Sequence, residues 1–201
     1  MDTFEAIETR RAIKEYDAGH RLTPEEEKKL LTAAIQSPTS FNIQHWRFMI
    51  LRDPDLRARI RTELGNDQSQ MTDASLLILM TADMKAWAKS PERYWRNAPE
   101  EVSTLLVNWM GPFHEGREWL QRDEAQRSIG MAMQTLMLAA TAMGYQSCPM
   151  IGFDIEAVAK LVNLPDDFVM GPMVAIGKGT KAPWPRPGQL TLDELIYENS
   201  F

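Results

Sequence analysis

Apolar residues recur at helical spacing in several parts of the chain. Thr23-Pro24-Glu25-Glu26 has the form of a capping box with proline at the first helical position, and an apolar stripe follows it as far as Ile35. Pro38 is expected to end this helix. A longer stripe predicts a helix over Arg122–Met143, and its small residues indicate a central position in the fold. Shorter helices are expected over residues 1–9, Leu56–Leu64 and Asp154–Val162.

Apolar runs of strand length predict the sheet. The strongest is Ser75–Thr81, and Trp46–Leu51 reads as a second buried strand. Further extended segments are expected over Tyr145–Gly152 and Pro172–Gly177.

Two segments have a different texture. Residues 85–120 mix tryptophans with many charges, and we expect a helical excursion or lid rather than a separate domain, so that residues 1–201 form one domain. The segment from Ala182 to Phe201 is rich in proline and then mildly apolar, and we expect it to pack on another subunit.

Composition and charge narrow the function. Hydrophobic residues make up 44% of the chain and charged residues 25%, as in ordinary globular proteins. The net charge of −6 argues against a general nucleic-acid binder but leaves a site for an anionic small molecule open. Cys148 is the only cysteine, so no intrachain disulfide can form. With no segment resembling a signal peptide or a membrane span, we expect a cytoplasmic protein that binds neither membrane nor nucleic acid.

Familiar catalytic motifs are missing from the sequence. The three histidines are far apart and lack metal-ligand spacing, so we expect no metal site. There is no G-x-S-x-G elbow, no Walker loop and no G-x-G-x-x-G.

Two cationic segments are candidates for binding an anion. Arg10, Arg11 and Lys14 offer guanidinium forks and a point charge that suit a phosphate. Lys178, Lys181 and Arg186 follow the last predicted strand. Taken alone, each segment fits a solvated cationic turn or tail somewhat better.

Two turns are candidates for binding a flat ligand. Ser37–Arg47 presents hydroxyls, amides and backbone N–H groups at one place, which suits a planar heterocycle or a phosphate. Cys148–Phe153 contains Pro149 and Gly152, which could bring backbone N–H groups close to a flat ligand. Such residues also simply stabilise turns, so both interpretations stay open at this point.

The order of these segments resembles the nitroreductase family of flavoproteins. The resemblance is carried by Arg10-Arg11-x-x-Lys14, by Ser37-Pro38-Thr39-Ser40-x-Asn42-x-Gln44-x-Trp46-Arg47 and by Asp73-Ala74-Ser75 at the start of a strand. It continues in Met137-Leu138-Ala139-Ala140-x-x-x-Gly144-Tyr145-x-x-Cys148-Pro149, followed by Gly152-Phe153-Asp154. It covers nearly the whole chain and is loosest over residues 85–120.

This resemblance implies an α+β fold with a central, mainly antiparallel sheet flanked by helices, and an intertwined homodimer with FMN at the subunit interface. Arg10, Arg11 and Lys14 match positions that hold the phosphate, ribityl and pyrimidine side. Arg186 matches a late phosphate-binding cation, and Lys178 is a weaker candidate. The remaining cofactor-binding positions implied are Pro38, Thr39, Ser40, Asn42, Gln70, Pro149, Met150, Ile151 and Gly152.

These implied positions divide into a loop, a polar group and a turn. The loop Pro38–Asn42 would reach the flavin from the other subunit. Gln70 would face the flavin ring, and the backbone N–H groups of the turn Pro149–Gly152 would address N5.

The sequence departs from the family pattern at four places. Ala12 stands where serine is common, and Met150-Ile151 where many members have a glutamate. Trp184 replaces a late lysine. His45 replaces the usual proline and could alter the loop or face the substrate.

By this resemblance the chain is an FMN-dependent oxidoreductase. It would transfer hydride from NADH or NADPH through flavin N5 to a nitroaromatic or quinone in a ping-pong cycle, with no catalytic side chain required. Two alternatives stay open: a flavin-binding or carrier protein without catalysis, and a reductive dehalogenase or enone reductase on the same scaffold.

Overall fold

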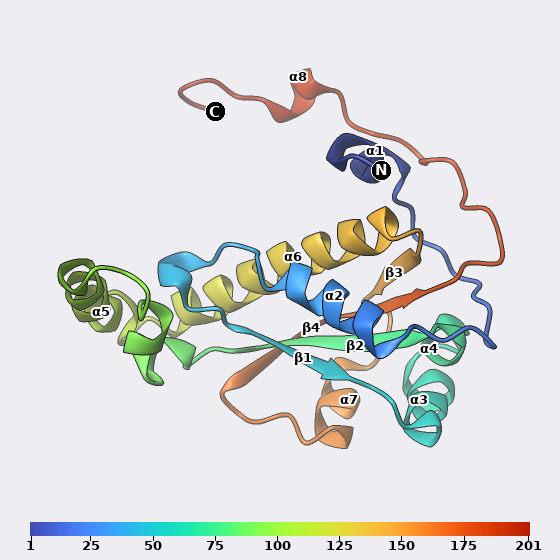
Figure 1. Ribbon diagram of the computed structural model, residues 1–201, viewed down its shortest axis with the longest axis horizontal. Helices are drawn as coiled ribbons and strands as arrows, with labels where there is room; N and C mark the ends of the chain where they lie inside the picture. The colour runs from blue at the N-terminus through green and yellow to red at the C-terminus, as the bar shows by residue number, and fades with distance from the viewer.

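A four-stranded antiparallel sheet forms the centre of the molecule in the computed structural model, which describes residues 1–201 (Figure 1). The strand order is β1-β2-β4-β3. The strands are β1 (Trp46–Ile50), β2 (Leu76–Asp83), β3 (Gln146–Met150) and β4 (Phe168–Gly177). The predicted antiparallel sheet flanked by helices is therefore confirmed.

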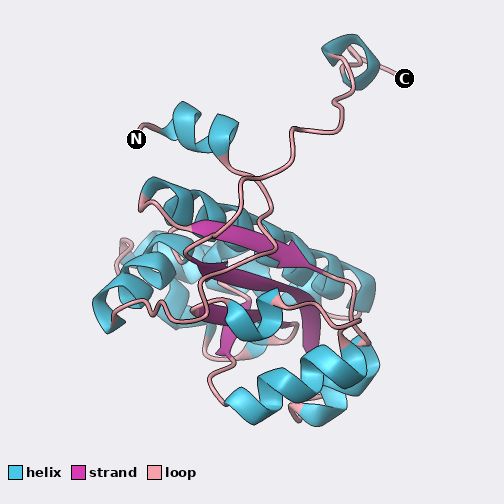
Figure 2. Ribbon diagram, turned by 90° about the vertical axis from the view of Figure 1, so that its right-hand side faces the viewer, coloured by secondary structure: helices cyan, strands magenta, loops and turns pink.

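Helices cover both faces of this sheet (Figures 1 and 2). Alternate residues of β2 belong to two separate apolar cores: Leu76, Ile78 and Met80 pack on the side of α2 and α6, while Leu77 and Leu79 pack on the side of α3 and α7. Every residue of β2 is buried, which explains the uninterrupted apolar run in the sequence. The helices concerned are α2 (Pro24–Ala34), α3 (Pro54–Arg59), α6 (Glu118–Ala142) and α7 (Ile155–Leu161).

Local sequence signals set several helix ends. At α2 the Thr23 hydroxyl accepts from the N–H of Glu26, whose carboxylate accepts from the N–H of Thr23, so the predicted capping box is present. Asp154 caps α7 by accepting from the N–H of Ala157. The predicted helix at Leu56–Leu64 is α3 followed by a π-helical turn, η2 (Ile60–Leu64). α6 starts at Glu118, four residues before the predicted Arg122.

The smaller elements lie at the edges of this framework. They are α1 (Thr3–Thr9), η1 (Ser40–Asn42), α4 (Gln70–Asp73), η3 (Ala86–Ala88), η4 (Pro91–Tyr94), α5 (Glu100–His114) and α8 (Leu192–Leu195). The region predicted as a helical excursion holds η3, η4 and α5, and its role as a lid stays a prediction. No helix combines the length and the apolar character needed to cross a membrane.

The two termini stand away from the sheet (Figure 2). α1 contacts α6, whereas residues 181–201 carry no buried residue and extend outward to α8. Phe4, Tyr197 and Phe201 expose 77%, 62% and 104% of their side-chain-bearing surface, far more than large apolar residues normally expose. The termini therefore present apolar surface that this chain does not cover by itself.

Candidate active site

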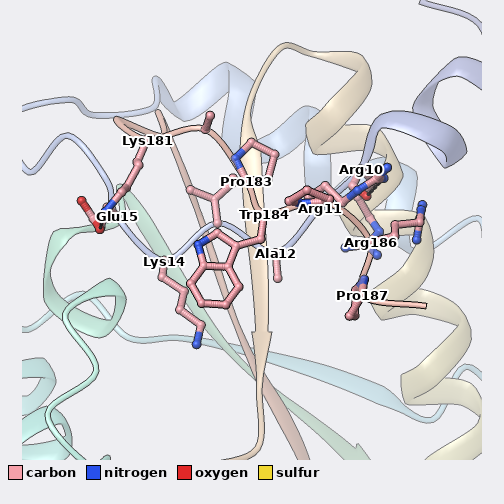
Figure 3. A pocket seen from close by; sticks show the side chains of 13 residues that line it. Arg10, Arg11, Ala12, Lys14, Glu15, Lys181, Pro183, Trp184, Arg186 and Pro187 are labelled. Carbon is pink, nitrogen blue, oxygen red and sulfur yellow. Dashed lines mark hydrogen bonds and ion pairs between the residues drawn. The ribbon is translucent and has the colours of Figure 1, made fainter.

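A pocket of about 450 Å³ lies where the segment after α1 meets the segment after β4 (Figure 3). Its walls are residues 10–15 and 181–187. Ala12 forms a bridge with Ser147 of β3, and Ile13 donates its N–H to the Ser147 carbonyl at 3.1 Å. Because alternate side chains of an extended segment point the same way, the burial of Ile13 turns Arg10, Ala12 and Lys14 outward.

The pocket gathers cations from both ends of the chain. Arg186 donates to the carbonyls of Ile7 and Glu8, and Arg11 donates to the same Glu8 carbonyl. Burial, then the charges of Arg186 and Arg11, lower the pKa of Arg10. None of these three guanidinium groups pairs with a carboxylate, and the lining acid Glu15 pairs with Lys181. Such a cluster favours an anionic ligand of more than one charge.

A second group of predicted residues lies beside this pocket at the end of β3. Burial raises the pKa of the Cys148 thiol, while the charges of Lys14 and Arg10 and a hydrogen bond from Gln70 oppose that shift. The Gln70 side chain donates to Gln68, and Gln68 donates to the Gly152 carbonyl at 2.9 Å. Lys14, Gln70 and the turn after β3 are thus neighbours around Cys148.

The turn Pro149–Gly152 offers free backbone donors. Met150 pairs with Met173 as the last residue of β3, and the N–H groups of Ile151 and Gly152 donate to no protein acceptor. Asn66 and Gln68 both donate to the Gly152 carbonyl and so fix the turn. Sequence reasoning missed these two side chains, because each lies more than 80 residues from Gly152 and no local pattern links them.

The turn Ser37–Arg47 does not reach the pocket within one chain. It precedes Trp46, which opposes Ala82, whereas β3 starts beside Gly177 at the Leu76 end of β2. The length of β2 between these ends is about 20 Å. Pro38, Thr39, Ser40 and Asn42 therefore lie at the opposite end of the sheet from Arg10 and Arg186 (Figure 1).

Local bonds account for the shape of this turn. The Thr39 hydroxyl accepts from the N–H of Gln44 at 3.0 Å, and Asn42 donates to the Tyr94 carbonyl at 2.8 Å. Phe41, Asn42 and Gln44 have φ values of 49°, 54° and 54°. Non-glycine residues in this left-handed region are uncommon and store strain.

Two sequence-based expectations need correction or replacement. His45 does not face a ligand: it is fully buried, and its Nδ1 lies 2.9 Å from the Ser128 hydroxyl of α6. Lys178 does not line the pocket; Lys181 and Trp184 do. Both corrections depend on long-range packing, which the local sequence does not show.

Comparison with known proteins places this geometry. The family model described as "Nitroreductase family" matches residues 7–178. The chain belongs to the nitroreductase family.

Relatives within this family match almost end to end. Protein DrgA of Synechocystis sp. (strain ATCC 27184 / PCC 6803 / Kazusa) is 64% identical, with 98% of this chain and 95% of that protein covered. A Bacillus subtilis (strain 168) protein assigned by name to the NAD(P)H nitroreductases, MhqN, is 28% identical over 94% of this chain and 95% of its own. A nitroreductase from Exiguobacterium sibiricum 255-15, solved in complex with FMN, superimposes with a TM-score of 0.89 at 26% identity, covering 98% of this chain and 97% of that one.

The site's chemistry fits an FMN group. A flavin phosphate carries about two negative charges, which the unpaired guanidinium groups of Arg10, Arg11 and Arg186 suit. The free N–H groups of Ile151 and Gly152 and the ammonium of Lys14 suit the polar edge of a flavin ring.

Proposed function

We propose that this nitroreductase-family protein is an FMN-dependent oxidoreductase that uses NADH or NADPH to reduce an acceptor such as a nitroaromatic or a quinone. The observation that carries the proposal is the convergence of Arg10, Arg11 and Arg186 in one pocket without a carboxylate partner. Bound FMN would supply the hydride chemistry at N5. The solved relative in complex with FMN and the relatives named for NAD(P)H support this choice of cofactors.

The chain's own residues would bind and orient the cofactor. Arg10, Arg11 and Arg186 would hold the phosphate, and Lys14 would stabilise negative charge on the pyrimidine side. The N–H groups of Ile151 and Gly152 would address N5. Gln70 would face the ring. No side-chain acid or base has to move a proton in this arrangement.

The site is incomplete in one chain, so we propose a homodimer. The turn that holds Thr39, Ser40 and Asn42 lies about 20 Å along the sheet from the cationic pocket. A second copy related by a two-fold axis would bring its turn to this pocket and take the other in return. The exposed apolar residues of α1 and of residues 190–201 supply surface for such an interface.

Removal of two pocket cations tests cofactor binding. Arg10→Ala combined with Lys14→Ala should yield a protein that loses FMN on gel filtration. The matched control, Lys28→Ala with Lys29→Ala, removes two exposed cations of α2 and should keep the flavin spectrum. A full flavin spectrum in the pocket variant would contradict the assignment.

Anaerobic mixing of the flavin-loaded protein with NADH and with NADPH separates an enzyme from a carrier. Bleaching of the flavin's visible band by either donor supports the oxidoreductase, and a spectrum unchanged by both supports a carrier. A panel of nitroaromatics, quinones, enones and halogenated aromatics then identifies the acceptor class.

The dimer has its own test. Leu192→Asp with Ile196→Asp places charges on the exposed apolar tail and should lower both the mass measured by light scattering and the bound flavin. Ile155→Asp on α7, also an exposed apolar position, should change neither.

A further inference from the structure

Trp184 combines high exposure with a place in the cationic pocket. Its side chain is 86% exposed, and it is one of the 13 residues that line the pocket. Isolated exposed hydrophobic residues are common and need no explanation by themselves. An indole on the wall of a cofactor-sized pocket is different, because a ligand there would cover it.

The sequence around Trp184 makes its backbone stiff. In Ala182-Pro183-Trp184-Pro185-Arg186-Pro187 every second residue is proline. Proline fixes its own φ and restricts the preceding residue to extended conformations. Trp184 and Arg186, two positions apart in an extended strip, therefore face the same side, and both line the pocket.

Both ends of this strip are attached to the N-terminal wall of the pocket. Before the strip, the N–H of Thr180 donates to the Glu15 carbonyl at 3.1 Å, and Lys181 pairs with the Glu15 carboxylate at 3.0 Å. At its far end, Arg186 donates to the Ile7 carbonyl at 3.1 Å. The indole is thus held between two fixed points, and little conformational entropy remains to be lost on binding.

The indole lies between the two kinds of cation. Figure 3 shows its ring beside Ala12, with Lys14 on one side and Arg10, Arg11 and Arg186 on the other. A ligand that joins an anionic group at the arginines to a polar ring at Lys14 has to pass the indole. Ala12 and the indole give the pocket apolar surface at this middle section.

We infer that Trp184 retains the cofactor by covering the chain that links the phosphate to the flavin ring; this inference rests on the proposed function. The indole buries carbon atoms of the linker, and its Nε1–H can donate to a linker hydroxyl or a phosphate oxygen. Because the indole is neutral, its contribution differs from that of the arginines in being insensitive to salt. Trp184 is therefore a cofactor-positioning residue that slows the release of FMN.

The test measures FMN release from the full-length, flavin-loaded protein. After dilution, the recovery of free-flavin fluorescence gives the dissociation rate. Trp184→Ala should release FMN about tenfold faster, equivalent to about 1.4 kcal/mol, by the same factor at low and at high salt. Trp184→Phe keeps an aromatic plane and should stay close to the wild type. Trp119→Ala removes a 65% exposed tryptophan on α6 and serves as the matched control.

Tryptophan emission gives a second readout. Bound flavin quenches a nearby indole, so Trp184→Phe should reduce the part of the emission that FMN quenches, whereas Trp119→Phe should not. An unchanged release rate in Trp184→Ala, or an effect that disappears at high salt, overturns the role of Trp184 alone. A wild-type protein that takes up no FMN overturns this inference and the proposed function together.

Discussion

Nδ1 of His45 lies 2.9 Å from the hydroxyl oxygen of Ser128, 83 residues away on α6. The Ser128 hydroxyl itself donates to the Glu124 carbonyl, so it accepts from His45 Nδ1–H. This assignment makes His45 a neutral imidazole whose Nε2 carries a lone pair. That Nε2 is buried and has no partner, so the structure has no place for a second proton on the ring.

Stability should therefore fall in acid through His45. Burial, reinforced by the charge of His114, lowers the pKa of His45 to about 4 from an unfolded value near 6.5. The unfolded chain binds the proton more tightly, so the stabilisation is complete above pH 6.5 and is lost as the pH falls toward 4. The loss should amount to at most about 3 kcal/mol. Urea unfolding at a series of pH values measures it.

The control for this prediction compares two histidines. His45→Asn should flatten the pH dependence between 6.5 and 4 relative to the wild type, whatever its stability at neutral pH. His20→Asn removes a partly exposed imidazole and should leave the slope as it was. Equal slopes in His45→Asn and the wild type would show that His45 does not carry the effect.

Lys89 joins the helical excursion to the sheet. Its ammonium donates to Asp83 at 2.8 Å and also to Asp167, and Asp83 is 2% exposed. Lys89→Met leaves a buried carboxylate whose nearest remaining cation is Arg47 at 3.8 Å. We expect a loss of about 1–3 kcal/mol in the free energy of unfolding, because a charge at Asp83 then lacks its main partner.

A double-mutant cycle separates the charge from packing. Asp83→Asn combined with Lys89→Met removes both charges and should recover part of the stability lost in Lys89→Met. Asp167→Asn, which removes the more exposed partner, should cost less than 1 kcal/mol or about that. If the double variant is no more stable than Lys89→Met, the buried charge is not the cause.

Local signals explain why much of the fold could be predicted. The capping box at Thr23 and the cap at Asp154 act within four residues, so the sequence is enough to place α2 and α7. β4 was harder: it begins at Phe168 rather than Pro172, because Gly171 reads as a break. In the structure Gly171 is a packing position, where an added Cβ would lie 2.8 Å from Cγ2 of Ile129.

The candidate site depended on distant pairs that spacing does not show. Arg10 and Arg186 are 176 positions apart, and their meeting in one pocket was expected only through the family resemblance. The burial of His45 depends on Ser128, so a polar turn residue could not be recognised as an interior one. Trp184 was noted as a departure, but its place on the pocket wall follows from contacts of the strip with Glu15 and Ile7.

The turn after α2 holds its strained backbone through Thr39. The Thr39 hydroxyl accepts from the N–H of Gln44, a residue with a φ of 54°. Thr39→Ala removes this acceptor, and we expect a loss of about 1 kcal/mol in stability. Thr39→Ser keeps the hydroxyl and should stay near the wild type. Thermal or urea unfolding of the cofactor-free proteins measures both.

Gln44→Gly separates strain from function in the same turn. Glycine adopts a positive φ without a steric penalty, so relief of strain should stabilise the chain by about 0.5–1 kcal/mol. The Gln44 amide donates only to the Asn42 carbonyl at 3.2 Å, an exposed bond that contributes little. If Gln44→Gly is stabilised yet binds FMN less tightly, the strained backbone serves the ligand. A destabilised Gln44→Gly would instead show that the side chain supports the fold, because release of a costly φ would then have been outweighed by lost contacts.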